Sequence, residues 1–519
     1  MAYKILTRDE HYQTSGPKRI LCLDGGGLRG ILTLGILRRV EAILRARHGN
    51  DPDFRLCHYF DLIAGTSTGA IIAAALALGK SVEEVIHHYE QLGREVFQRE
   101  WFRQGVLRAR YDESALIQNL KSVFGERVTL GDGTLKTGLL VVTKRLDTGS
   151  PWPLGNNPRG RYFTAGAGDQ WISNSSYPLW QVVRASAAAP SYFEPEPITI
   201  AAQEGRKTVI GTFVDGGVSP FNNPSFQAFM YATLSGYRVG WEAREDRLLL
   251  VSIGTGISDP SKAPSLIAAT GAIRSLLSLM DDCAALVETV MQWMSNSPTA
   301  RKIDRELGTC ANELRAPAPL LTYLRYNVVL TEEAIGDLGV SASAKLVARL
   351  GEMDNPDNLA PLLEIGTAAG NKIDENHFPP PAFDLPALPD DDGVQKYVKR
   401  EDQTVVAVQL TLEGAGFTYE KWGGTQRCKA GDWIVNNGVD VYTVDRESFE
   451  QTYKKVGNGT YVKTAPVWAR RAREAGRVET KEGSTGYEAG DYLVSNDPEG
   501  KDSYAISAAK FAAMYEPAN

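Results

Sequence analysis

The amino-acid sequence predicts a layered α/β domain with a mainly parallel sheet, followed by two small repeated modules. Three observations support this prediction. Strand-like apolar runs alternate with helical patterns over roughly the first 260 residues, a proline-rich stretch follows at 377–393, and two similar segments come after it. Alternating strands and helices are typical of a parallel sheet covered by helices. At 519 residues the chain is long enough for two to four domains.

The elements of the first domain follow in order from their apolar patterns. Residues 19–24 and the run "YFDLIAG" are predicted as buried strands, because each is a short continuous apolar run. Helices are predicted over 31–47, where apolar residues recur at helical spacing, and over "AIIAAALALG", which ends at Gly79. Ser81 opens another helix with the capping-box sequence "SVEE". "LKTGLLVVT" and "RLLLVSIGTG" are two more predicted strands, and residues 262–370 are mostly helical in pattern.

The stretch "HFPPPAFDLPALPDDDG" at 377–393 has five prolines and an acidic run, which is typical of a semi-rigid linker. We therefore predict one large domain over 1–376, a linker over 377–393, a repeat module over 394–456 and a second over 457–519. Each module is predicted to be α+β or mainly β, with a hairpin and a short closing helix.

The two modules align residue by residue. Each begins with "YVK", at Tyr397 and Tyr461. The matched aromatic pairs are Trp433 with Tyr492, Tyr442 with Tyr504, Phe449 with Phe511, and Tyr453 with Tyr515. The simplest interpretation is that these rings form the small core of each module. The duplication also suggests a recognition or control unit, through which a small-molecule activator or a protein partner could act.

Composition narrows the class of protein. A net charge of −7 argues against non-specific nucleic-acid binding, which needs a basic surplus. The cysteines are odd in number and far apart, so neither a disulfide framework nor a zinc site is expected: Cys22, Cys57, Cys283, Cys310 and Cys428. The first residues lack the apolar core of a signal peptide, and the apolar stretch "LIAGTSTGAIIAAALALG" is interrupted by Thr-Ser-Thr. We expect a cytoplasmic protein, at most peripheral to the inner face of the membrane.

The loop "DGGGLRG" at 24–30 contains Gly25, Gly27 and Gly30 in the pattern G-x-G-x-x-G. A dinucleotide site would need an acidic residue at the end of the second strand, about 20 residues on. That strand runs into "GTSTG" instead, and Glu41 lies in the middle of the predicted helix. The glycines are better explained by backbone N–H groups that bind a negative oxygen at a helix N-terminus.

The sequence "GTSTG" at 65–69 follows a strand and opens a helix, which is the context of a nucleophile elbow. The tight turn exposes the Ser67 hydroxyl, and Gly65 and Gly69 carry no Cβ that would collide with it. A G-x-S-x-G match alone arises by chance, but this context strengthens it.

A serine nucleophile needs a base, and no histidine is well placed. The six histidines are His11, His48, His58, His87, His88 and His377, and none lies on a turn after a predicted strand. Asp215 in "TFVDGGVSPFNNP" ends an apolar strand and is followed by Gly216 and Gly217. A strand-end aspartate is often an ordinary turn residue, but this one could accept the serine proton directly as half of a Ser–Asp dyad.

With these motifs in order, the chain resembles the bacterial patatin-like phospholipases over roughly residues 17–260. "RASAAAPSYFEP" at 184–195, "NNP" at 222–224 and "SIGTG" at 252–256 also match family signatures. The resemblance implies a three-layer α/β/α hydrolase domain, with Ser67 and Asp215 as the catalytic dyad. It also implies an oxyanion hole built from the glycine loop and supported by its neighbours: Gly25, Gly26, Gly27, Arg29 and Gly30. An arginine at position 29 could instead contact a lipid phosphate, which we rank second.

The resemblance implies hydrolysis of fatty-acyl esters of glycerophospholipids through an acyl-enzyme, with a phospholipid or membrane surface as substrate and no metal or cofactor. One alternative is a signal-activated, membrane-degrading antiviral effector that uses the same chemistry. A second alternative, disfavoured by the intact Ser67 and Asp215, is a non-catalytic lipid-binding protein. The sequence leaves the oligomeric state open.

The segment 94–110 combines basic and bulky apolar residues, as interfacial helices do. An ordinary surface helix with a solvated basic face is the favoured interpretation. The residues concerned are Arg94, Phe97, Arg99, Trp101, Phe102, Arg103, Leu107, Arg108 and Arg110.

Overall fold

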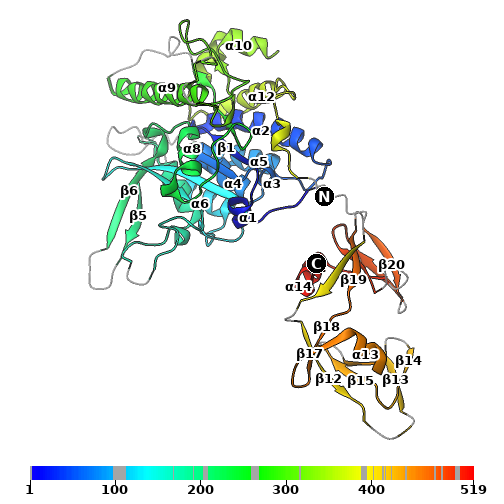
Figure 1. Cartoon of the computed structure of the whole chain (residues 1–519). Coiled ribbons are helices and arrows are strands. Elements are labelled where there is room, and N and C mark those ends of the chain that lie inside the picture. The colour runs from blue at the N-terminus through cyan, green and yellow to red at the C-terminus, as the bar shows by residue number, and fades with distance from the viewer. Residues whose placement is uncertain are drawn as a thin grey trace. The chain divides into compact units, whose positions relative to one another are not determined.

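The computed structural model divides into two compact units, Ile5–Leu385 and Met1–Lys4 with Pro386–Asn519 (Figure 1). Among the described residues, no helix is long and apolar enough to cross a membrane. The residues that the structure describes are 3–96, 113–166, 169–190, 192–202, 208–258, 268–311, 313–314, 317–386, 394–400, 403–411, 414, 416–421, 424–438, 441–472, 475–480, 483–496 and 503–518.

The first unit is built on one large sheet. Its strands are β1 (Lys18–Leu23), β2 (Leu62–Thr66), β3 (Gly138–Arg145), β4 (Pro151–Gly155), β5 (Glu196–Ala201), β6 (Val209–Asp215), β7 (Leu248–Ile253) and β9 (Thr322–Tyr326). The order across the sheet is β5-β6-β3-β2-β1-β7-β9, with β4 also paired to β3. Neighbours from β3 through β9 run parallel, and β4, β5 and β6 pair antiparallel at one edge. The mainly parallel sheet predicted from the alternating pattern is confirmed.

Helices cover both faces of this sheet (Figure 1). The helices of the described part of this unit are α1 (Arg8–Gln13), α2 (Gly30–Arg47), α3 (Leu56–Tyr59), α4 (Thr68–Ala77), α5 (Val82–Val96), α6 (Glu113–Phe124), α7 (Leu179–Ser186), α8 (Ser225–Thr233), α9 (Ala268–Met294), α10 (Glu332–Asp337), α11 (Ala344–Leu350) and α12 (Leu359–Gly370). Helix α4 packs against β1, β2 and β3. The other face shares a core with α8 and α9, in which Phe229 and Met291 meet Ile20 of β1. A short pair, β8 (Ile257–Ser258) with β10 (Val329–Leu330), completes the unit.

The proline-rich stretch differs from the prediction in its first half. Residues 377–385 belong to the first unit, where Phe378 and Phe383 are fully buried. Asp384 accepts hydrogen bonds from Arg47 Nε and Nη2 at 2.7 and 2.8 Å. The first half of the stretch is therefore not a linker, because the buried rings of Phe378 and Phe383 pack it into the first unit. Residues 387–393 lie outside the described residues.

The second unit holds two similar five-stranded sheets. One contains β12 (Thr404–Gln409), β15 (Trp433–Asn436), β16 (Val441–Val444), β17 (Tyr453–Gly457) and β18 (Thr460–Lys463). The other contains β11 (Gln395–Lys399), β19 (Val467–Arg471), β22 (Tyr492–Ser495), β23 (Ser503–Ile506) and β24 (Tyr515–Pro517). Short helices α13 (Arg446–Thr452) and α14 (Ala508–Met514) and the hairpins β13 (Phe417–Lys421) with β14 (Gly424–Cys428) and β20 (Gly476–Thr480) with β21 (Gly483–Tyr487) complete the copies.

The two copies exchange one strand. β11 opens the first repeat but lies between β19 and β24 of the second sheet. β18, the equivalent strand of the second repeat, lies between β12 and β17 of the first sheet. The predicted division at residue 456 therefore separates the two sequence repeats, but each sheet contains strands from both repeats. This exchange is possible because the two "YVK" strands are equivalent and either can occupy the same position in a sheet.

The matched aromatic residues occupy equivalent positions in the two cores. Trp433 stacks on Phe449 with ring centroids 4.1 Å apart, and Tyr492 stacks on Phe511 at 3.9 Å. The hydroxyls of Tyr442 and Tyr453 lie 3.1 Å apart, and those of Tyr504 and Tyr515 lie 3.4 Å apart. The repeated rings are thus core residues of each copy.

The strand exchange predicts that the repeats stay together after the chain is cut between them. A specific protease site inserted at Asn458, in the exposed turn between β17 and β18, should be cleaved without release of either piece. Each piece would hold a strand of the other's sheet, so the nicked protein should elute from gel filtration as one species and separate only in denaturant. Elution of the piece after residue 458 as a free module would contradict the exchange.

Candidate active site

Ser67 lies at the sharp turn between β2 and α4, with a backbone φ of 56° and ψ of −122°. A positive φ is costly for a residue with a side chain, and it is held here by close packing of the surrounding chain. A Cβ on Gly69 would lie 2.1 Å from the Leu23 carbonyl oxygen, and one on Gly65 would lie 2.2 Å from the Gly69 carbonyl oxygen. Both positions therefore require glycine, and the predicted strand–turn–helix context of Ser67 is present.

The carboxylate of Asp215 is the partner of the Ser67 hydroxyl. Ser67 Oγ lies 2.5 Å from Asp215 Oδ2, although the two residues are 148 positions apart in the chain. Asp215 is the last residue of β6, and its other oxygen accepts the Gly217 N–H at 2.7 Å. Its own N–H donates to the Ala188 carbonyl, within the "RASAAAPSYFEP" segment. The carboxylate is thus held by two hydrogen bonds and the backbone by a third, and the residue is only 3 % exposed.

Burial raises the pKa of Asp215 to about 6. The hydrogen bonds from Ser67 and Gly217 and the positive charge of Arg184 oppose this shift, because each favours the ionised carboxylate. Arg184 is itself fully buried and donates to Glu113 Oε2 and to the Glu194 carbonyl. A carboxylate with this pKa is ionised at neutral pH and is more basic than an exposed aspartate.

The glycine loop enters α2 through a short 3₁₀ turn at Gly27–Arg29. The Gly25 N–H donates to the Asn222 carbonyl, and the Leu28 N–H donates to the Met353 carbonyl. Among the described residues the N–H groups of Gly26 and Gly27 have no hydrogen-bond acceptor, and both glycines line the pocket above Ser67. Gly25, which the resemblance places among the oxyanion donors, instead uses its N–H to anchor the loop.

The motifs that resemble family signatures converge on this loop. Besides Asn222 of "NNP", Thr255 of "SIGTG" donates from Oγ1 to the Gly25 carbonyl at 3.0 Å. Arg29 is 3 % exposed, and its Nη1 donates to Ser258 Oγ at 2.7 Å. Its guanidinium therefore supports the loop from behind and does not line the pocket. Gly30 begins α2, directly beside Thr68 and Tyr89.

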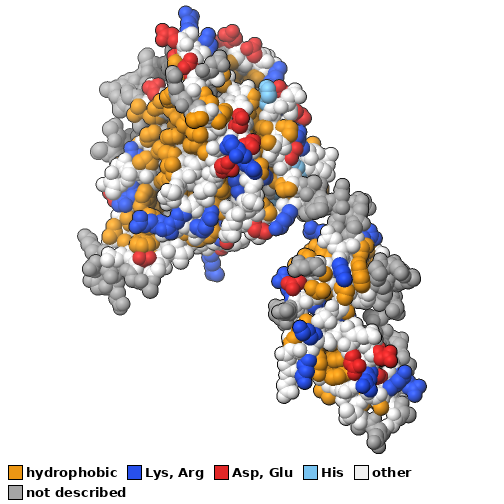
Figure 2. All heavy atoms as spheres, in the orientation of Figure 1, with side chains coloured by type: hydrophobic (Ala, Val, Ile, Leu, Met, Phe, Trp, Pro, Cys, Tyr) orange, Lys and Arg blue, Asp and Glu red, His pale blue; other side chains and the backbone are white. Residues whose placement is uncertain are grey.

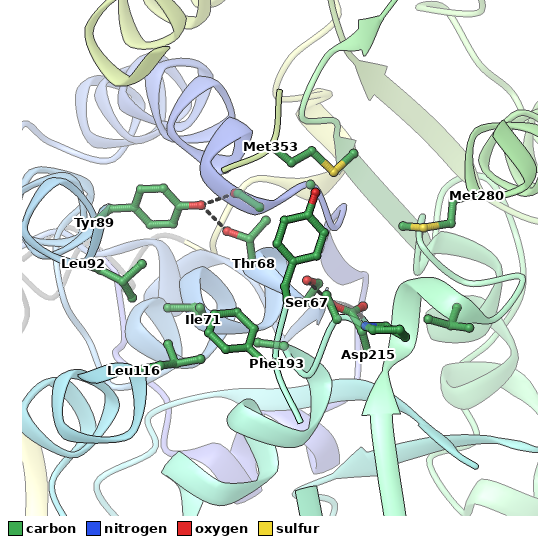
Figure 3. Close-up of a pocket in the computed structure, with 17 residues that line it drawn as sticks. Ser67, Thr68, Ile71, Tyr89, Leu92, Leu116, Phe193, Asp215, Met280 and Met353 are labelled. Atoms are coloured by element: carbon green, nitrogen blue, oxygen red, sulfur yellow. Dashed lines mark hydrogen bonds between the residues drawn. The ribbon is translucent and has the colours of Figure 1, made fainter. Parts of the chain in front are cut away.

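Tyr89 of α5 joins the glycine loop to the start of α4, as Figure 3 shows. Its hydroxyl donates to the Gly27 carbonyl and also bonds Thr68 Oγ1, next to Ser67. Sequence reasoning missed this residue, because a tyrosine on an amphipathic helix has the pattern of an ordinary core residue.

The pocket over Ser67 has an apolar wall. Figure 3 shows Ile71, Leu92, Leu116 and Phe193 on one side of Ser67, and Met280 on the other. The space above Ser67, counted together with the open solvent at its mouth, is about 910 Å³. Neither a histidine nor an arginine nor a lysine is among the described residues that line it. Met280 and Met353 come from the second half of the chain and were not predicted.

Other predicted features lie away from this site. His11 is buried beside Asp61, and His377, at the start of the proline-rich stretch, pairs with Asp374. The described residues contain no group of three or more His, Cys, Asp or Glu side chains placed to hold a metal ion. The segment 94–110 lies outside the described residues after position 96, so its role at a membrane stays a prediction.

Comparison with known proteins agrees with this geometry. A family model described as "Patatin-like phospholipase" matches residues 21–229. A "cGAMP-activated phospholipase" of Vibrio cholerae is 30% identical over 269 residues, which are 50% of this chain and 70% of that protein. A "cUMP-AMP-activated phospholipase" of Escherichia coli is 32% identical over 250 residues, or 48% and 68% of the two chains.

A second "cGAMP-activated phospholipase", from Escherichia coli (strain TW11681), is 29% identical over 253 residues. That match spans 48% of this chain and 65% of the relative. The likeness to these relatives therefore covers about half of this chain and about two thirds of theirs.

The raised pKa of Asp215 predicts a pH-dependent cost in stability. Between pH 3.8 and about 6 the unfolded state loses a proton that the folded state keeps, so stability falls as the pH rises through this window. A shift of this size corresponds to about 3 kcal/mol. Asp215→Asn removes the charge and should raise the free energy of unfolding at pH 8 by up to that amount, with little gain at pH 4. Chemical denaturation at both pH values measures this, and Ser67→Ala, which keeps the carboxylate, is the matched control. An equal effect of Asp215→Asn at the two pH values would contradict the assignment.

Proposed function

This chain belongs to the patatin-like phospholipase family, and on that premise we propose that it hydrolyses fatty-acyl esters of glycerophospholipids through a Ser67–Asp215 dyad. The observation that carries the proposal is the 2.5 Å contact between Ser67 Oγ and Asp215 Oδ2 at the base of an apolar pocket. The available N–H groups of Gly26 and Gly27 beside that contact support the same chemistry.

In the proposed reaction, Ser67 Oγ attacks the ester carbonyl carbon while Asp215 accepts the hydroxyl proton. The negative oxygen of the tetrahedral intermediate accepts hydrogen bonds from the N–H groups of Gly26 and Gly27. Such preorganised donors are worth about 3 kcal/mol each in hydrolases. Asp215 then returns the proton to the departing alcohol oxygen, which leaves an acyl-Ser67. A water molecule then gives a proton to Asp215 as its oxygen attacks the acyl carbon. The bond from that carbon to Ser67 Oγ breaks, Asp215 returns the proton to Oγ, and the fatty acid leaves.

The wall of the pocket supports an acyl chain as the bound group. Ile71, Leu92, Leu116 and Phe193 line one side of Ser67 and offer an apolar surface from three helices and a loop. The buried Arg29, held by Ser258, is not presented to a lipid phosphate. We therefore propose that recognition inside the described pocket is of the acyl chain.

Removing either member of the dyad should abolish turnover without unfolding the protein. Ser67→Ala lacks the nucleophile, and Asp215→Asn keeps the shape but loses the base, so each should lower kcat by several orders of magnitude. In the wild type, kcat/KM should fall about tenfold per pH unit below pH 6, because a protonated Asp215 cannot accept the serine proton. Fatty-acid release from phospholipid vesicles and circular dichroism measure both points. Substantial activity of folded Asp215→Asn would assign the base to another residue.

A second candidate function is a signal-activated effector, and the names of the three relatives favour it. Each is described as a phospholipase activated by a cyclic nucleotide compound. In this chain such control could act through the duplicated C-terminal unit or through the hydrolase unit itself.

This second candidate predicts low basal activity that rises when a cyclic dinucleotide is added. Full-length protein should release fatty acid about tenfold faster or more with cGAMP or cUMP-AMP, in the range usual for allosteric coupling. AMP is the control nucleotide, and Ser67→Ala should be inactive in every case. Equal rates with and without these compounds would favour a constitutive lipase.

A further inference from the structure

A buried ion pair lies directly behind the glycine loop. Asp24 follows β1 and precedes Gly25, and its carboxylate is 5 % exposed. Arg325 of β9 donates to both carboxylate oxygens, from Nη1 to Oδ1 at 2.9 Å and from Nη2 to Oδ2 at 2.5 Å. The two residues are 301 positions apart, so this contact joins the loop to a strand outside the segment 21–229.

Arg325 is itself fixed by further contacts. Its Nη1 also donates to Ser252 Oγ at 2.7 Å, and its Nε lies 3.9 Å from Glu288 Oε2. Glu288 on α9 in turn accepts from Arg301 Nε at 2.8 Å. Negative and positive groups therefore alternate from Asp24 through Arg325 and Glu288 to Arg301. Of these four, Arg301 is the one whose side chain reaches solvent, with 38 % exposed.

The position of the pair gives it influence over the catalytic loop. Asp24 is one residue from Gly25, whose N–H and carbonyl are anchored by Asn222 and Thr255. Gly26 and Gly27 follow with N–H groups that no described protein group accepts. A shift of the chain at Asp24 would therefore turn these two N–H groups away from the oxygen they must bind. A misplacement of about 1 Å in such a group can cost roughly 100-fold in rate.

Bidentate arginine–carboxylate pairing fixes direction as well as distance, because the planar fork admits one relative orientation. Burial raises the pKa of Asp24, and Arg325 opposes that rise. Without the guanidinium, the Asp24 carboxylate would be a buried charge that lacks its bidentate partner. Such a carboxylate either takes up a proton or moves toward water.

We propose that Arg325 is a positioning residue of the hydrolase: through Asp24 it fixes the direction in which Gly26 and Gly27 present their N–H groups. The proposal rests on the proposed acyl hydrolase function. Its simplest rival is an ion pair that stabilises the fold and leaves the loop unaffected.

The test compares full-length wild type with Arg325→Met, Arg325→Lys and Arg301→Met. The substrate is the soluble ester p-nitrophenyl butyrate, and the assay temperature lies below the unfolding transition of every variant. Arg325→Met should lower kcat by about 100-fold with KM changed by less than about twofold, because the loop acts on the tetrahedral intermediate. Arg325→Lys keeps a charge but loses the fork, so its loss should be intermediate. Arg301→Met removes the outer pair with Glu288 and should leave kcat unchanged.

Hydrogen exchange gives a readout that does not depend on turnover. The Gly25 and Leu28 N–H groups donate within the loop region, so peptide 24–30 should exchange faster in Arg325→Met and not in Arg301→Met. If Arg325→Met does not fold, Asp24→Asn with Arg325→Met removes both charges together and should fold with the same low kcat.

The outcomes separate the two proposals. A folded Arg325→Met with wild-type kcat and unchanged exchange at 24–30 would overturn the role of Arg325. A loss of activity that merely follows the folded fraction would also overturn it and leave a structural ion pair. Wild-type protein that shows no turnover on the ester or on phospholipid would instead remove the proposed hydrolase function.

Discussion

The contact between Ser67 and Asp215 is the constraint on which the rest of the first unit depends. Ser67 directly follows β2, a strand of the parallel part of the sheet, and Asp215 ends a strand of the antiparallel edge. Their side chains meet because β3 lies between β2 and β6, and Thr143 of β3 is the register partner of Asp215. Glycine at 65 and 69 lets the turn close tightly enough to bring the hydroxyl up to the carboxylate. The contact between the two side chains therefore depends on the order of the strands in the sheet.

The electrostatic design differs from that of a serine–histidine site. Asp215, a buried carboxylate that contacts the Ser67 hydroxyl directly, is made more basic by burial, while Ser67, the Gly217 N–H and Arg184 favour its ionised form. The same burial destabilises the folded protein above the pKa, so basicity and stability oppose each other at this residue. Asp215 lines the apolar pocket, whose side chains bury its carboxylate.

Much of the site could be predicted from sequence, because its main parts are encoded locally. The turn at Ser67 and the glycine loop each follow a recognisable strand, and Asp215 ends one; in all three places the marker residues lie within a few positions of one another. Tyr89 and Arg325 could not be predicted, since their roles arise from contacts across 62 and 301 residues. The sequence also could not predict that the Gly25 N–H points to the Asn222 carbonyl, because this depends on where Asn222 lies in the fold.

The fold shows the same division between local and distant information. Alternating apolar runs predicted the parallel sheet, and aligned aromatics predicted the core of each repeat. The proline-rich stretch was misjudged because Phe378 and Phe383 bury themselves between the prolines. The exchange of β11 and β18 could not be predicted from the sequence, because the two strands carry the same "YVK" residues.

That exchange has a consequence for how the protein is made. Translation produces β11 early, but its partners β19 and β24 are completed at residues 471 and 517. The first repeat likewise has to wait for β18 at residues 460–463 before its own sheet closes. The first sheet therefore has all its strands once residue 463 has emerged, whereas the second sheet, which holds β11, has to wait for residue 517. Meanwhile the hydrolase unit, whose strands end at residue 330, has every strand it needs. The second unit is thus the later of the two to fold, and exposed strand edges in the waiting repeats are where a chaperone would be needed.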